Sequence, residues 1–82
     1  MLLSNLNDVG LALRHARRGQ QIRQQQLAWR TGKNQSLISR VEHGHQVEFE
    51  TLMRLCKALN LGIVIRPLEP KEIKARKPRR RG

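Results

Sequence analysis

The stretch QQQLAWRTGKNQSLISRVEHG, residues 24–44, decides the fold of this chain. Its apolar residues fall at helical spacing in two short runs, one over residues 24–31 and the other over residues 35–43. Gly32 lies between the runs and supplies a backbone able to turn with positive φ, while Gly44 stops the second run. We therefore predict two short helices joined by a tight turn.

The outer face of the second of these helices is polar. Ile38 and Val41 lie on one arc, so packing that arc inward turns the opposite arc outward. The outward arc consists of Gln35, Ser36, Ser39 and Arg40. Gln can bond adenine and Arg can bond guanine through two hydrogen bonds each, while Ser adapts to bases or phosphates. This stripe predicts a helix that reads base edges of DNA. Leu37 either supports the core or contacts a thymine methyl group.

The residues that flank this stripe favour phosphate contact or helix capping. They are Arg23, Gln24, Lys33 and Asn34. Asn34 is a good cap for the second helix, and the free N–H groups at the start of a helix attract phosphate. A pair of helices of this kind can place the first across the DNA backbone and the second in the major groove.

Two further helices complete the predicted fold. One spans about residues 7–18, begins at Asn7 or Asp8 and ends at Gly19. The other spans about residues 50–60, where leucines repeat at intervals of three and four. We expect an all-α fold, a compact bundle of four to five short helices containing a helix-turn-helix.

A short β-branched run follows the last helix. After Gly62, the residues Ile63, Val64 and Ile65 form a run that Pro67 bounds. One strand is not stable without a partner, and the sequence holds no second candidate strand. The simplest solution is the same strand of a second copy, paired across a two-fold axis in a homodimer. The alternative is an extended segment that packs on its own helices.

The charge predicts an extended polyanionic partner. The chain holds 17 Lys and Arg against 6 Asp and Glu, a formal net charge of +11. Residues 71–82 hold seven basic and one acidic side chain, which leaves ten against five, or +5, in residues 1–70. We divide the chain into a DNA-binding and dimerisation domain, residues 1–66, and a basic tail, residues 67–82, disordered in isolation.

Composition and spacing argue against an enzyme, a cofactor and a metal site. A chain of 82 residues has little interior in which to build a catalytic pocket. Ser36, Ser39 and His15 form a nucleophile and base only if contacts are assumed that the sequence does not imply. His43 and His45 lack further ligands at useful spacing, so phosphate contact or solvent exposure is expected of them.

Single residues and absent segments give three smaller expectations. Cys56 cannot form an internal disulfide, and its apolar surroundings favour a buried, inert thiol over a reactive one. No signal segment and no stretch of about 20 apolar residues appears, so we expect a cytoplasmic protein that binds no membrane. Trp29, the one tryptophan, is expected to pack, with a partner-facing role as the alternative.

The spacing of the motif resembles the phage-repressor or Xre-type helix-turn-helix proteins over residues 9–61. The matching residues are Gln24-x-x-Leu27-Ala28-x-x-x-Gly32, then Ile38-Ser39-x-x-Glu42-x-Gly44, then Thr51-Leu52-x-x-Leu55-x-x-Ala58-Leu59. The resemblance implies that Arg17 pairs with Glu42 to tie the first helix to the third. It also implies a phosphate clamp at Gln24, a cap at Asn34 and base readers at Gln35, Ser36, Ser39 and Arg40. Arg23 and Lys33 depart from the family, which has a capping Thr and a small apolar residue there.

The end of the domain, Leu61-Gly62-Ile63-Val64-Ile65-Arg66-Pro67, resembles the HipB-like antitoxins. This likeness implies a homodimer joined through its C-terminal strand and a HipA-type kinase toxin as a partner. The expected function is a sequence-specific repressor that binds double-stranded DNA at an inverted-repeat operator and regulates its own toxin–antitoxin operon. The alternatives are a stand-alone phage-type repressor, or a protein-interaction module with nonspecific nucleic-acid binding.

Overall fold

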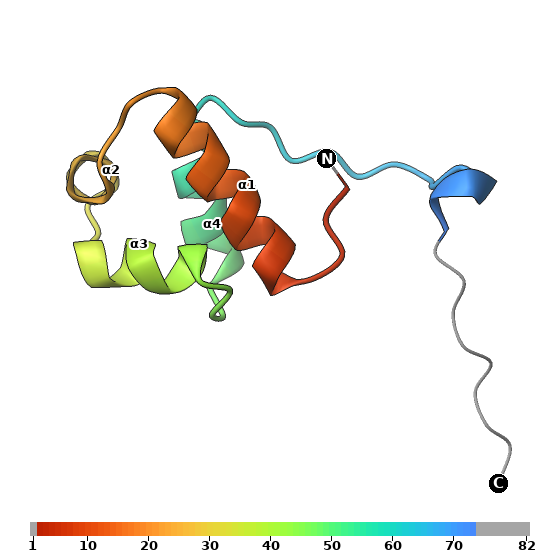
Figure 1. Ribbon diagram of the computed structural model, residues 1–82, viewed down its shortest axis with the longest axis horizontal. Coiled ribbons are helices and arrows are strands. Elements are labelled where there is room, and N and C mark those ends of the chain that lie inside the picture. The colour runs from red at the N-terminus through yellow and green to blue at the C-terminus, as the bar shows by residue number, and fades with distance from the viewer. Residues whose placement is uncertain (1, 74–82) are drawn as a thin grey trace, which may run out of the picture.

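The computed structural model describes residues 2–73, which form four α-helices and one short 3-10 turn (Figure 1). The elements are α1 (Leu6–Gly19), α2 (Gln24–Thr31), α3 (Gln35–Glu42), α4 (Phe49–Ala58) and η1 (Pro70–Glu72). The predicted all-helical bundle is therefore confirmed, and α2 has the predicted bounds. Residues 74–82, the greater part of the predicted basic tail, lie outside the described residues.

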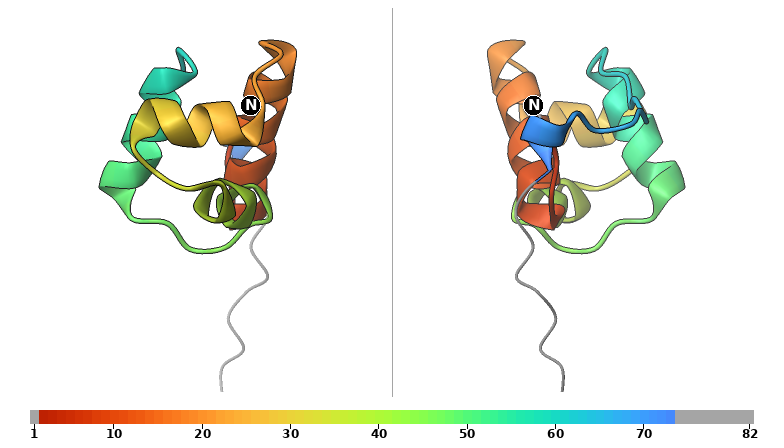
Figure 2. Two further views of the ribbon diagram at one scale, coloured as in Figure 1. Left: turned by 90° about the vertical axis from the view of Figure 1, so that its left-hand side faces the viewer. Right: turned by 90° about the vertical axis from the view of Figure 1, so that its right-hand side faces the viewer.

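One apolar core joins the four helices. Its buried members are Leu13, Ile22, Leu27, Ala28, Ile38, Val41, Leu55, Cys56 and Leu59. Helix α3 packs against α1 and α2, and α2 also packs against α4. Figure 2 shows α1 and α4 on opposite sides of the bundle, with α2 bridging the space between them. Helices α1 and α4 therefore support the two helices of the motif, and α3 lies at an edge of the bundle.

All four α-helices end in the same way. After each helix, one residue adopts positive φ. These residues are Gln21 (58°), Gly32 (71°), Gly44 (85°) and Asn60 (59°). In each case the N–H of the next residue bonds the carbonyl oxygen five residues before it, as Ile22 does to Arg17 at 3.0 Å. This is the Schellman arrangement, which satisfies the last carbonyls of a helix.

Helix α1 ends at Gly19 as predicted, but neither Gly19 nor Gly62 makes the turn with positive φ that follows its helix. Gly19 is the last residue of α1 and the turn falls two residues later at Gln21, while Gly62 follows a turn that Asn60 has already made. In both cases the residue after the turn, Ile22 or Leu61, packs against the core. Burial of that apolar residue sets where the turn falls, because the Schellman arrangement brings it back against the helix.

Helix α1 also begins earlier than predicted. The side chain of Asn5, rather than that of Asn7 or Asp8, caps the helix by accepting the N–H of Asp8 at 2.9 Å. The carboxylate of Asp8 in turn accepts the N–H of Ser4 at 2.8 Å. Together the two side chains satisfy two backbone N–H groups at the start of α1, much as a capping box does.

Trp29 does not pack, and the expectation that it would was wrong. Leu27, Ala28 and Thr31 fill the inner face of α2. At 100° per residue, position 29 falls on the opposite side of so short a helix. The indole is accordingly 85% exposed.

The β-branched run after α4 is extended and open to solvent. Residues 61–69 have no regular secondary structure within the described chain. Val64 is 78% and Ile65 92% exposed, so this run does not pack on its own helices. Beyond it, the guanidinium of Arg66 donates two hydrogen bonds of 2.8 Å to the carboxylate of Glu72, which closes the segment around η1.

Candidate nucleic-acid interface

A buried ion pair fixes α3 against α1. Arg17 Nε donates to Glu42 Oε2 at 2.5 Å and Arg17 Nη2 donates to Glu42 Oε1 at 3.0 Å. Both side chains are enclosed, with exposures of 8% for Arg17 and 2% for Glu42. Arg17 Nη1 also donates to the carbonyl oxygen of Ile22 at 2.8 Å. The pair that the family resemblance implied is thus a two-bond contact between the last residue of α3 and the last turn of α1.

The Glu42 carboxylate remains ionised in this site. Burial raises the pKa of Glu42, but hydrogen bonds from Arg17 and Gln24 and the positive charges of Arg17 and Arg14 lower it by more. The net result is a pKa below the ordinary value of 4.5. At neutral pH the carboxylate therefore carries a full charge and accepts hydrogen bonds from both partners.

Gly10 allows this close approach, and sequence reasoning missed it. A Cβ atom at Gly10 would lie 2.6 Å from the carbonyl oxygens of both Val41 and Glu42. Both neighbours are backbone atoms and cannot swing aside. The signal available in the sequence was a glycine inside a helical pattern, which often has a packing reason.

Hydrogen bonds continue from the buried pair to the outer surface. Gln24 Nε2 donates to Glu42 Oε1 at 3.0 Å, and Gln35 Nε2 donates to Gln24 Oε1 at 3.3 Å. Gln24 is the first residue of α2 and Gln35 the first residue of α3. The chain of contacts therefore holds the starts of both helices together at the surface, and each amide orients the next.

The outer face of α3 carries the predicted polar stripe. Gln35, Ser36 and Arg40 are exposed and Ser39 is half-buried, whereas Ile38 and Val41 are buried. Asn34 caps the helix, because its Oδ1 accepts the N–H of Leu37 at 2.8 Å. Figure 1 shows α3 along one edge of the bundle, and of the stripe only Gln35 has a printed bond to another described helix, to Gln24 of α2.

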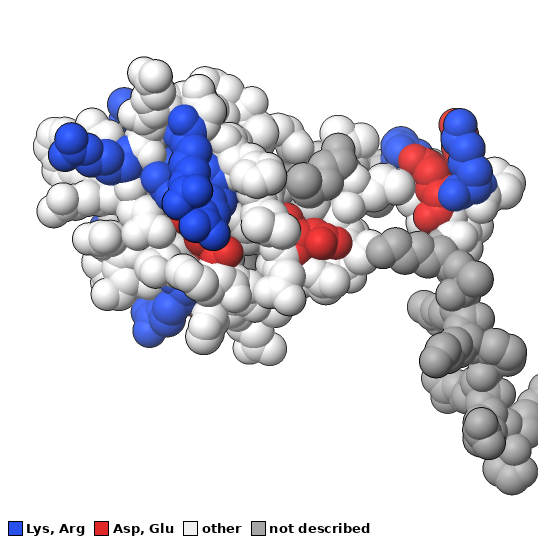
Figure 3. All heavy atoms as spheres, in the orientation of Figure 1, with Lys and Arg blue, Asp and Glu red and all other residues white. Residues whose placement is uncertain are grey.

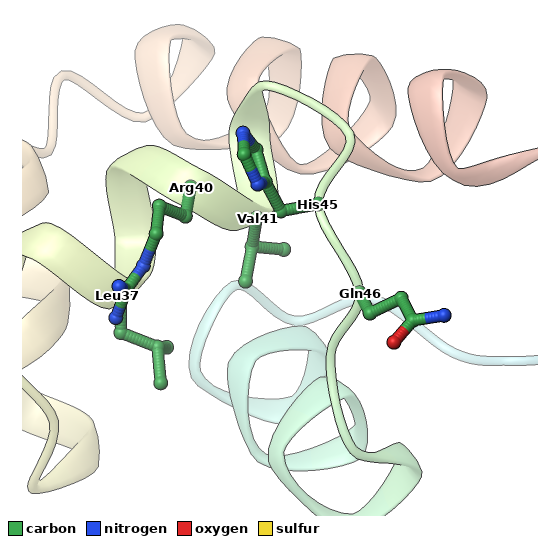
Figure 4. Close-up of a pocket in the computed structure, with 5 residues that line it drawn as sticks. All are labelled: Leu37, Arg40, Val41, His45 and Gln46. Atoms are coloured by element: carbon green, nitrogen blue, oxygen red, sulfur yellow. The ribbon is translucent and has the colours of Figure 1, made fainter.

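A shallow hollow lies beside the end of α3 (Figure 4). Its lining consists of Leu37, Arg40, Val41, His45 and Gln46. Leu37 packs partly against the core and also forms an apolar wall of this hollow, so it serves the core while remaining accessible. The surface of α3 thus offers hydrogen-bond donors and an apolar contact side by side.

Arg23 and Lys33 lie at the two ends of α2. Arg23 occupies the cap position without a capping side-chain bond, and Gln26 Oε1 accepts the Arg23 N–H at 2.8 Å instead. Lys33 follows the turn at Gly32, and its N–H bonds the carbonyl of Ala28 at 2.8 Å. The departures from the family motif are therefore accommodated by the backbone, and both cations remain available at the surface.

Positive charge is concentrated around the motif. Residues 9–41 contain no Asp or Glu and seven Lys or Arg, whereas residues 42–73 contain four basic and five acidic residues. In Figure 3, Lys and Arg cover much of the half of the molecule that carries α2 and α3, while those at the end near η1 lie beside Asp or Glu. A polyanion is therefore attracted to the side on which the polar stripe of α3 lies.

Of the remaining sequence candidates, His45 lines the hollow beside α3, whereas His43 contacts its own helix and Cys56 lies in the core. His43 Nδ1 lies 2.7 Å from the carbonyl oxygen of Ser39, and no group of three metal-ligating side chains occurs in residues 2–73. Cys56 is buried, and burial raises the pKa of its thiol. No helix of the described part is long and apolar enough to cross a membrane.

Comparison with known proteins agrees with this geometry. The profile of the helix-turn-helix domain family matches residues 8–67. The restriction-modification controller protein C.AhdI from Aeromonas hydrophila is 29% identical, with a TM-score of 0.66 over 70% of this chain and 84% of that chain. A serine-to-alanine variant of HipB in complex with an O2 20mer has a similar fold, with 18% identity and a TM-score of 0.77 over 84% of this chain and 97% of that chain.

No curated protein sequence gives a significant match. The family profile covers most of the chain, including the polar stripe and both ends of α2. This chain therefore belongs to the helix-turn-helix domain family of DNA-binding transcriptional regulators, and within it to the phage-repressor or Xre type.

Proposed function

We propose that this chain is a sequence-specific transcriptional repressor that places α3 in the major groove of double-stranded DNA. Gln35, Ser36, Ser39 and Arg40 are the base readers in this account. The observation that carries it is the chain of hydrogen bonds from Arg17 through Glu42 and Gln24 to Gln35. A base-reading side chain discriminates only when its orientation is fixed, and this chain ties Gln35 to the core.

Gln24 acts as the phosphate clamp. Its amide nitrogen carries two hydrogens, and one of them is used by Glu42 at 3.0 Å. The second is available for a phosphate oxygen without breaking that bond. Lys33 and the N–H groups at the starts of α2 and α3 supply further phosphate contacts around it, which set the register of α3 on the duplex.

The functional unit is a homodimer on an inverted-repeat operator. The support is the exposed run Ile63, Val64 and Ile65, whose backbone and side chains another copy can cover as a second strand. Phe49 and Met53, exposed apolar residues on α4, add to the surface that a second copy can bury. A two-fold axis would set the two α3 helices about 34 Å apart, one turn of DNA.

The finer proposal is an antitoxin that holds a HipA-type kinase toxin and represses their shared operon. It rests on the fold likeness to HipB over 84% of this chain and on the strand-forming segment at the end of the domain. The likeness to C.AhdI, a controller protein, favours a second candidate, a regulator that acts without a toxin. Co-purification with the product of the neighbouring gene separates the two candidates.

The basic tail adds attraction that does not depend on sequence. We assign residues 1–66 to the DNA-binding and dimerisation domain and residues 67–82 to the tail. Residues 74–82 contribute six Lys or Arg. Their deletion should reduce the salt dependence of DNA binding, because fewer counterions are then released, and should leave the preferred sequence unchanged.

As a cytoplasmic repressor, the protein needs no catalytic residue, cofactor or metal.

Selection of binding sites from a random duplex library tests the proposal. The wild-type protein should select an inverted repeat, and Arg40→Ala should relax one base position in each half-site at a cost of about 1–3 kcal/mol. Arg54→Ala is the matched control, because Arg54 is also an exposed arginine but lies on α4. The same consensus from the wild-type protein, from Arg40→Ala and from Gln35→Ala would exclude α3 as the reading helix.

A further inference from the structure

Trp29 is an exposed aromatic side chain on a helix that carries no other large apolar residue outside the core. It is the one tryptophan of the chain and is 85% exposed on the outer face of α2. Tryptophan buries a large area at low entropy cost, and exposed tryptophans are enriched as anchors of protein interfaces. The fold does not need this indole, because α2 is held by Leu27, Ala28 and Thr31.

DNA bound along α3 leaves the indole free. Gln24 and Leu27 lie on the side of α2 that meets α3 and the core. Trp29 lies five residues after Gln24, about 140° further round the helix, and so faces away from α3. The base readers and the indole therefore belong to different faces of the molecule.

The surroundings of Trp29 define the chemistry of an occupant. A shallow hollow next to it is lined by Arg23, Gln25, Gln26 and Trp29 itself. The guanidinium of Arg23 suits a carboxylate, the indole suits an apolar or methylene group, and the two glutamines offer hydrogen bonds. Arg30 is exposed on the same helix, and residues 9–41 contain no acidic side chain.

We propose that this Trp29 surface (Arg23, Gln25, Gln26, Trp29 and Arg30) docks an acidic protein segment in which Asp or Glu stands beside an apolar residue. Charge selects such a partner and disfavours the same surface of a second copy, because residues 9–41 hold seven basic and no acidic side chains. The partner binds while α3 remains on DNA, so repressor and partner form a ternary complex. The site depends on the geometry of α2 and not on which bases α3 reads.

The fluorescence of the single tryptophan tests the first half of this proposal. Acrylamide should quench Trp29 equally well in the free full-length protein and in its complex with a 30-bp duplex. Quenching should also stay constant as protein concentration rises through dimer formation. Shielding by the duplex would assign Trp29 to the DNA interface, and shielding by concentration alone would assign it to the contact between copies. Either result overturns the proposal.

Selection from a displayed peptide library tests the second half. Peptides selected on the full-length protein should carry Asp or Glu next to an apolar residue. They should bind Trp29→Ala and Arg23→Glu at least about tenfold more weakly, the loss expected of an interface anchor. Leu11→Ala is the matched control, because Leu11 is also an exposed apolar residue but lies on α1, away from α2 and from the surface assigned to a second copy. Peptides without acidic residues, or binding unchanged by Trp29→Ala, would overturn the proposal.

DNA binding measured on the same variants keeps this proposal separate from the proposed function. Trp29→Ala should retain wild-type affinity for duplex DNA and a wild-type melting temperature, since its side chain supports neither the core nor α3. If the wild-type protein fails to discriminate DNA sequences but still binds acidic peptides through Trp29, the repressor proposal fails and the docking site stands. Loss of DNA binding in Trp29→Ala would place the indole on DNA and overturn the docking site.

Discussion

Helices α3 and α4 have similar inner faces and opposite outer faces. Helix α3 buries Ile38, Val41 and Glu42, and α4 buries Thr51, Leu55 and Cys56, so each contributes apolar and polar residues to one interior. Outside, α3 presents amide, hydroxyl and guanidinium groups, whereas α4 presents the apolar Phe49 and Met53 among charged residues. The inner faces of both helices hold the bundle together by packing in its interior. The outer faces differ in what they can bind, and on this difference we assign α3 to DNA and α4 to a second copy of the chain.

The largest expected effect comes from the polar residue that α3 buries. Glu42→Ala leaves the guanidinium of Arg17 buried without its partner, which should lower the free energy of unfolding by about 3–5 kcal/mol. Glu50→Ala is the matched control on α4, since Glu50 and Arg54 form an exposed pair at 3.8 Å that should contribute little. Urea denaturation of both variants measures the difference. Equal losses would show that the buried pair does not hold α3.

Glycine-to-alanine substitutions at two positions of α1 should change the stability of the protein in opposite directions. Gly10→Ala puts a Cβ against the carbonyl oxygens that end α3, so it should destabilise the protein by about 1–3 kcal/mol. Gly19→Ala meets nothing within 4 Å and removes a flexible residue from a helix, so it should stabilise by about 0.5–1 kcal/mol. Thermal melts of the two variants decide the sign. Stabilisation by Gly10→Ala would mean that α1 and α3 lie further apart.

A charge placed on either outer face tests whether α3 binds DNA and α4 binds a second copy. Ser36→Glu sets a carboxylate against phosphate and should weaken duplex binding by about tenfold or more while leaving the dimer intact. Met53→Glu should instead weaken dimerisation by a similar factor, through like charges facing across the two-fold axis. Sedimentation and gel shift together separate the two effects. Loss of the dimer in Ser36→Glu would contradict the assignment.

The smallest effect is a dependence of stability on pH. The pKa of Glu42 is lowered in the folded protein, so its contribution is complete above the ordinary value of 4.5 and is lost as pH falls from there through the folded pKa. Stability should therefore decline with acidification below that value. In Glu42→Gln this part of the decline should be absent. Urea denaturation at a series of pH values measures this. If the free energy of unfolding falls equally with pH in the wild-type protein and in Glu42→Gln, the Glu42 carboxylate is not the titrating group.

The sequence predicts most of the fold because periodicity and glycine placement act locally. The bounds of α2, the turn at Gly32 and the outward polar arc of α3 all follow from residues within two helical turns. The residues that make the turns after α1 and α4 do not follow, because burial of Ile22 and Leu61 places these turns at Gln21 and Asn60. Local pattern cannot weigh such tertiary packing against the preference of glycine for positive φ.

The candidate surface was partly predictable for the same reason. The residues of the stripe could be found, since a helix fixes which side chains share a face. The bond from Gln24 to Glu42 and the close approach at Gly10 join residues distant in sequence, so spacing alone does not indicate them. The exposure of Trp29 could have been foreseen, because α2 has only two turns and its inner face was already filled.

The most direct test of DNA reading by α3 is to measure binding of the purified protein to its own upstream DNA and to a scrambled duplex. Fluorescence anisotropy across a salt series is the readout. Phosphate contacts alone give steep and equal salt dependence on both duplexes, whereas base reading adds affinity on one of them. We predict a preference of about a thousandfold or more for the native sequence. Equal binding to the two duplexes at every salt concentration would contradict the assignment of α3 as a reading helix.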